Sequence, residues 1–129
     1  MDMFFADPNE VPLPPEEVRI RALRAEPWPD GGRVRVYIEV DPFQQRPNAD
    51  LVITDQRGEE IATASIIGSM ERKIELTMHL RGLELGGEYT LNVTLFYAKI
   101  EEEPGPDGEL RPIERSVVDK GQALFTIPN

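Results

Sequence analysis

The chain has 129 residues, enough for one domain with a single buried core; 40% are hydrophobic and 29% charged, as in ordinary globular proteins. Its 14 basic and 24 acidic residues leave a net charge of −10, which repels phosphate backbones and anionic lipids and argues against nucleic-acid and membrane partners. The absence of cysteine excludes disulfides, thiolate catalysis, zinc–thiolate sites and iron–sulfur clusters.

The start of the chain, MDMFFADPNEVPLPP, has neither the cationic residues nor the apolar run of a signal peptide, so we expect a cytoplasmic protein. Residues 1–17 are predicted to form a Pro-rich extended arm, because several prolines forbid a helix and favour a polyproline-like path. These prolines are Pro8, Pro12, Pro14 and Pro15. Phe4 and Phe5 make the tip of the arm apolar and are candidates for packing on the domain or on a partner.

From Val18 onward the chain alternates apolar and polar residues with a period of two, which indicates half-buried strands. The first predicted strand places Val18, Ile20 and Ala22 on one face and is followed by the turn EPWPDGG. Further strands are predicted at 34–40, 51–53, 61–67, 74–80, 89–100 and 115–127. About seven strands with turn signals between them predict that residues 18–129 form an all-β, two-sheet antiparallel sandwich.

The last two strands are expected to extend past the core as a ribbon over residues 98–118, because apolar residues continue beyond the core strands. Gly121 is expected to allow a bulge where this ribbon enters the sandwich. The connection at the ribbon tip is acidic. It is either a solvated loop kept soluble by the repulsion between its own charges, or a surface that docks on a basic partner. The acidic candidates for partner binding are Glu101, Glu102, Glu103 and Asp107.

The stretch RGLELGGEYTLNVTLFY, residues 81–97, predicts a tight corner that leads into a strand. Tyr89 is placed so that its ring can lie across that corner and its hydroxyl can donate a hydrogen bond to the backbone upstream. Such a hydrogen bond contributes about 1 kcal/mol to the stability of the fold. Leu83 is expected to pack beneath its ring. The pattern Leu83-x-x-Gly86-x-x-Tyr89 resembles the corner before the penultimate strand of fibronectin type III and related immunoglobulin-like domains. This resemblance spans roughly residues 18–127 and implies a binding or spacing module without catalytic residues.

Aspartates in predicted loops are the only metal-ligand candidates, because oxygen-rich loops at one end of a sandwich can hold calcium. They are Asp30, Asp41, Asp50, Asp55 and Asp107. Aspartate is also common in turns for conformational reasons, and no EF-hand spacing is present. Loop-mediated binding of calcium or a small ligand is therefore the alternative function.

The sequence predicts no catalytic residue and no cofactor. His79 is the only histidine, and alternation turns it away from the core without a serine or cysteine partner. No nucleotide-binding or hydrolase motif occurs. The sequence favours a non-enzymatic protein–protein interaction or structural module, which uses the arm, an edge strand or the 98–118 ribbon to bind a protein partner or a second copy.

Overall fold

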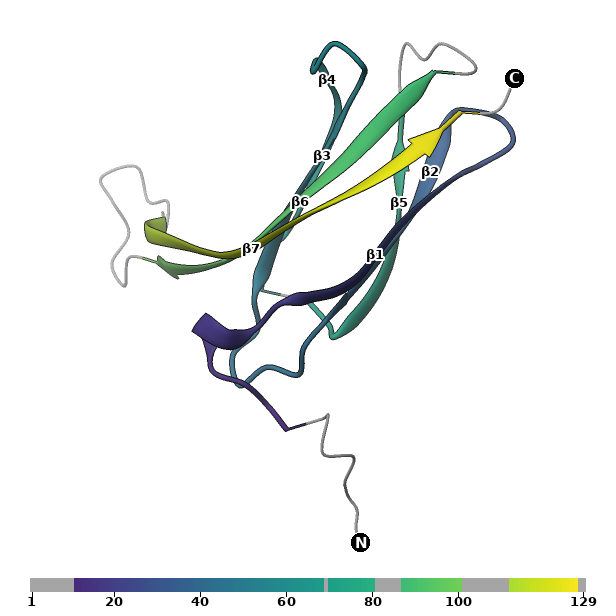
Figure 1. The fold of residues 1–129 in the computed structure, drawn as a ribbon. Helices are drawn as coiled ribbons and strands as arrows, with labels where there is room; N and C mark the ends of the chain where they lie inside the picture. Colours follow the sequence, from purple (N-terminus) through teal and green to yellow (C-terminus); the bar gives the residue numbers. More distant parts are fainter. Residues whose placement is uncertain (1–10, 69, 81–86, 101–111, 128–129) are drawn as a thin grey trace, which may run out of the picture.

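Seven strands form two antiparallel sheets that face each other as a β-sandwich, as predicted (Figure 1). The structure is a computed structural model that describes residues 11–68, 70–80, 87–100 and 112–127, and the side chains of 99, 100 and 112–114 are not among those described. One sheet has the order β1 (Ile20–Pro27), β2 (Arg33–Val40), β5 (Lys73–His79). The other has the order β4 (Glu60–Ile66), β3 (Asn48–Thr54), β6 (Glu88–Ile100), β7 (Pro112–Thr126).

The core lies between the sheets and is built from the inward side chains of every strand. The predicted alternation in β2 is confirmed, because its apolar residues are fully buried while the residues between them are half-buried. The same alternation holds in the inner positions of β3 and β6. The fully buried side chains of these three strands are Val34, Val36, Ile38, Val40, Leu51, Ile53, Leu91, Val93 and Leu95.

β1 departs from its predicted alternation. The prediction placed Ile20 and Ala22 on one face, but Ala22 is exposed, and Leu23 and Ala25 pack against the core instead. The pairing of β1 with β2 shifts between Ile20 and Ala22, so Arg21 occupies a β-bulge. One extra residue transfers all following side chains to the opposite face, which is why strict alternation is wrong beyond this point.

The bulge between β6 and β7 does not lie at the predicted position. Gly121 pairs in regular register with Val93, whereas the register shifts between Leu95 and Phe96 and leaves Val118 as the extra residue of β7. The prediction of a bulge at Gly121 is therefore wrong. The glycine at this position instead leaves room for side chains of β1 in the other sheet.

Gly121 lies where β1 of one sheet crosses closest to β7 of the other. A Cβ atom at this position would lie 3.3 Å from the side-chain ends of both Ile20 and Leu23. The backbone N–H of Ile20 donates to the Asp119 carboxylate at 2.9 Å. The missing side chain thus allows a close approach, and a carboxylate of β7 satisfies a backbone donor of β1.

The described part of the arm is attached to the domain and is not extended throughout. Leu13 forms a parallel bridge with Phe43; its N–H donates to the Pro42 carbonyl at 3.0 Å and its carbonyl accepts from the Gln44 N–H at 2.9 Å. Pro15–Glu17 forms a single 3₁₀ turn, η2, where an extended path was predicted. Proline is compatible with the first position of such a turn, because an N–H at that position would have no partner within the turn.

No helix in the described part of the chain is long and apolar enough to cross a membrane.

The predicted terminal ribbon is present at the base of the last hairpin. β3 pairs with β6 as far as Phe96, and beyond that position residues 97–100 pair with residues 112–116 of β7. Figure 1 shows these two strands running out past β3. The acidic connection, residues 101–111, lies outside the described residues.

Candidate interaction surface

Phe96 marks the point where the ribbon leaves the sandwich. It faces outward from the four-stranded sheet, yet it is only 4% exposed. The guanidinium of Arg115 lies 3.6 Å from the centroid of its ring and also donates to the carboxylate of Asp50. This cation–π stack covers an aromatic side chain on the outside of the sheet.

An apolar hollow of about 380 Å³ lies beside this stack, bordered among others by Ile67, Ala98 and Arg46. Ile67 is 57% exposed, and Val117, which pairs with Phe96 across the ribbon, is 49% exposed. Aromatic, arginine and exposed aliphatic side chains in one patch are typical of protein-binding surfaces. We call Ile67, Phe96, Arg115 and Val117 the ribbon-base surface.

Sequence reasoning missed the ribbon-base surface. Arg115 and Phe96 lie far apart in the chain, and only the register of β6 against β7 makes them diagonal neighbours. The available signal was Ile67, a large apolar residue at the end of a predicted strand. Together with Phe96 on the outward face of its own strand, it indicated that this face is not wholly polar.

Trp28 is held in the turn between β1 and β2. Arg33 lies 3.8 Å and Arg35 5.7 Å from the centroid of its ring. Both arginines have carboxylate partners, since Arg33 contacts Asp30 at 2.9 Å and Arg35 contacts Glu75 at 3.1 Å. This arrangement stabilises the turn and the outer face of the three-stranded sheet.

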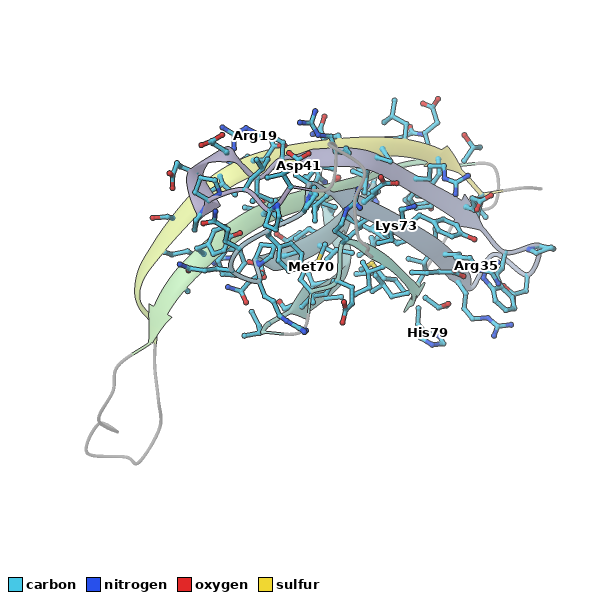
Figure 2. The ribbon with its side chains drawn as sticks, turned by 90° about the horizontal axis from the view of Figure 1, so that it is seen from below. Arg19, Arg35, Asp41, Met70, Lys73 and His79 are labelled. Atoms are coloured by element: carbon cyan, nitrogen blue, oxygen red, sulfur yellow. The ribbon has the colours of Figure 1, made fainter. Side chains whose placement is uncertain are left out.

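Asp41 joins the arm, β1 and the end of β2. Its side chain is 9% exposed, and its carboxylate accepts from the Arg19 backbone N–H at 3.0 Å and from the Arg21 guanidinium. Figure 2 shows Arg19 and Asp41 side by side, at the opposite end of the sandwich from Arg35 and His79. The bulge that turns Arg21 outward also directs it to this carboxylate.

The four predicted calcium ligands that the structure describes have separate partners. Within the described ranges, no group of three or more His, Cys, Asp or Glu side chains lies close enough to hold a metal ion. Asp50 accepts from the Ser65 hydroxyl at 2.9 Å and contacts Arg115, and Asp41 makes the contacts given above. Asp107 lies outside the described residues. Calcium binding stays a prediction.

Asp30 and Asp55 both act as turn caps. The pKa of Asp30 is lowered first by the Gly32 N–H at 2.8 Å and then by the Arg33 guanidinium. The pKa of Asp55 is lowered mainly by the backbone N–H of Glu59, which lies 3.0 Å from its carboxylate. Hydrogen bonds to the ionised form favour that form, so both aspartates stabilise turns as anions.

Tyr89 is buried at the start of β6, as predicted. It is 5% exposed, and its ring stacks on Phe125 with 5.7 Å between the centroids and 23° between the planes. Leu83 and the rest of residues 81–86 lie outside the described residues, as do the partner-binding candidates Phe4, Phe5, Glu101, Glu102, Glu103 and Asp107. His79 is exposed, as the alternation predicted.

No protein-family model matches the chain, and no curated protein matches it. Its fold is similar to part of the β-glucuronidase of Ruminococcus gnavus, at 16% identity and a TM-score of 0.51. It is also similar to part of the β-glucuronidase of Lactobacillus rhamnosus, at 16% identity and a TM-score of 0.50. Each match covers 86% of this chain and 16% of the enzyme chain. The chain therefore spans only 16% of the length of these enzymes, and the likeness shows the β-sandwich fold alone.

Proposed function

We propose that the chain is a non-enzymatic protein-interaction module on an immunoglobulin-like sandwich of the fibronectin type III variety. In constant-type immunoglobulin domains the fourth strand joins the sheet of the first, second and fifth strands. Here β4 pairs with β3 in the other sheet, which favours the type III resemblance.

A cytoplasmic location is part of the proposal, because a chain without cysteine forms no disulfides and does not need an oxidising compartment to fold.

The ribbon-base surface carries this proposal. Ile67 and Val117 are about half exposed on either side of Phe96, which Arg115 holds in a fixed orientation. Burying the exposed half of an aliphatic side chain of this size contributes about 1 kcal/mol, so two such residues beside the ring of Phe96 can help to anchor a partner. Phe96, Arg115 and Val117 lie on the paired strands β6 and β7, so this part of the surface is preorganised for binding.

The arm and the ribbon tip remain proposed contributors to the same interaction. The tip of the arm offers Phe4 and Phe5, and the acidic ribbon tip would favour a basic partner.

The test is capture of a partner from the cells that make the protein, compared between two matched variants of immobilised chain. Val117→Asp places a charge in the ribbon-base surface, while Leu124→Asp places the same charge at another exposed position of β7 outside it, since Leu124 is 80% exposed and Val117 is 49% exposed. We expect the wild type and Leu124→Asp to retain the same protein in stoichiometric amount and Val117→Asp to lose most of it. Equal retention by both variants would refute the ribbon-base surface as the binding site.

A further inference from the structure

The four edge strands of the sandwich differ in how well they are protected. Within the described part of the chain, β1 and β5 end one sheet and β4 and β7 end the other, so the outer backbone N–H and C=O groups of these strands have no neighbouring strand there. β1 and β7 lie against each other, where Gly121 permits close approach and Asp119 accepts the N–H of Ile20. That side of the sandwich is therefore closed to a further strand.

β5 is protected by charge. Its sequence, KIELTMH, places Lys73, Glu75 and His79 on the exposed face, alternating with the side chains that face the core. Charged side chains on an edge strand oppose pairing with another sheet, because they would have to be desolvated or set against like charges. β5 is thus a poor edge for strand addition.

β4 lacks both the close packing of β1 on β7 and the charged outward residues of β5, and its one irregularity is a bulge at Ile61, near its start. After Glu60 its sequence, IATASI, contains no charged residue, no proline and no glycine. Thr63 and Ser65 point outward and are exposed, while Ala62 and Ala64 pack toward the core. An uncharged strand of β-branched and small residues is a favourable template for a new strand.

The connection that follows β4 leaves this edge open. It crosses to β5 in the opposite sheet, and Met70 within it is fully buried in the core. Figure 2 shows Met70 in the interior of the sandwich. Because the connection turns inward at this point, it does not run alongside β4.

The position of Glu60, the one charged residue of β4, is compatible with a second copy of β4 as the added strand. Thr63 is the midpoint of Glu60–Ile66, and the pairing of β4 with β3 is regular from Ala62 to Ile66, with Ile61 as an extra residue. Antiparallel pairing about a twofold axis through Thr63 therefore matches Ala62–Ala64 of one copy with Ala62–Ala64 of the other. In this register the two Glu60 residues lie at opposite ends of the paired segment, so two carboxylates never oppose each other although each chain carries a net charge of −10. Ala62 faces Ala64 of the other copy, which keeps core-facing residues on one face.

We propose that two copies of this chain associate through β4, pairing it antiparallel about Thr63 and joining their four-stranded sheets into one continuous sheet. The pairing rests on the proposed function, since it names one edge and one partner of the interaction module. It leaves the ribbon-base surface residue Val117, which lies on β7 at the other edge, available to a different protein.

The first experiment measures molar mass by sedimentation equilibrium over a range of concentrations. We expect the wild type to approach twice the 14.6 kDa of the single chain and Thr63→Lys, which sets two ammonium groups opposite each other, to remain a single chain. Thr77→Lys makes the same change at an exposed position of the β5 edge and should associate like the wild type. Circular dichroism checks that both variants are folded.

The second experiment tests the register. The chain has no cysteine, so Thr63→Cys introduces a single thiol. Facing residues of antiparallel strands have Cα atoms about 4.5–5.5 Å apart, within the range of a disulfide, so mild oxidation should link two chains covalently. Ser65→Cys lies on the same face but is displaced by four residues from its counterpart, roughly 13 Å, and should not cross-link.

A wild type that stays a single chain at every concentration overturns the pairing, as does equally rapid cross-linking of Ser65→Cys. A single chain that still retains a partner through Val117 would refute β4 pairing and leave the proposed function standing. A β4-linked dimer whose partner capture is unaffected by Val117→Asp would refute the ribbon-base surface and leave the pairing standing.

Discussion

Replacing Asp41 by alanine tests how the arm is fixed to the sandwich. The Asp41 carboxylate is nearly buried and accepts from the backbone of Arg19 and from the side chain of Arg21. Arg19 precedes the bulge in β1, and Arg21 is the bulge residue itself. Loss of the two contacts removes the side-chain restraint on the path by which the arm enters the first strand, while the backbone bond from the Asp41 N–H to the Arg19 carbonyl remains.

The expected loss follows from the surroundings of each contact. A hydrogen bond from a backbone N–H to a carboxylate contributes about 1.5–3 kcal/mol. The side chain of Arg21 is 58% exposed, so its ion pair is screened by water and contributes about 0–1 kcal/mol. Asp41→Ala should therefore lower the free energy of unfolding by about 2–4 kcal/mol, and the melting temperature by roughly 10 °C.

Urea unfolding followed by fluorescence measures this loss, because Trp28 is the only tryptophan and reports on the β1–β2 turn. Arg21→Ala removes only the exposed ion pair and should cost at most about 1 kcal/mol. Asp41→Asn keeps an acceptor for the Arg19 N–H and should recover part of the loss. If Asp41→Ala lowers the free energy of unfolding no more than Arg21→Ala does, the hydrogen bond from the Arg19 N–H does not stabilise the entry of the arm into β1.

Three further outcomes are expected. Gly121→Val should lower the free energy of unfolding by about 1–3 kcal/mol, measured in urea, because the added side chain meets β1; an unchanged midpoint would contradict the close approach. Tyr89→Phe should lower it by about 1 kcal/mol while the ring stays buried, and an unchanged melting curve would show that the hydroxyl contributes nothing. Asp30 and Asp55 have lowered folded pKa values, so their stabilisation is present above the ordinary aspartate pKa near 4 and is lost as pH falls through the folded values. The double variant Asp30→Asn, Asp55→Asn should therefore lose less stability than the wild type on acidification below about pH 4, as measured by thermal unfolding.

The strand content and the sandwich were predictable because the core strands obey a period of two with little interference. In β2, every second residue from Val34 to Val40 is buried, as its sequence indicates. Tyr89 at the start of β6 is buried, as the corner pattern indicated. These features depend on residues that are close in the sequence.

Prediction was wrong where backbone irregularities intervened. The bulge at Arg21 reverses the faces of β1, and the bulge of β7 lies at Val118 instead of Gly121. A bulge requires that one strand hold an extra residue relative to its partner, so it belongs to a pair of strands and leaves no periodic signal in either sequence. The candidate aspartates show the same limit, because loop residues come together only as the strands between them allow.

The sequence by itself determined the class of fold, the strands of the core, the long terminal hairpin and the strongly negative charge, because each depends on composition or on neighbours along the chain. Only the tertiary structure decided that Arg115 covers Phe96, that β1 and β7 close one side of the sandwich, and that β4, which carries no charge after Glu60, ends the four-stranded sheet on the other side. Contacts of this kind depend on strand order and register. Many segments must fold together to set both, so no single segment encodes them.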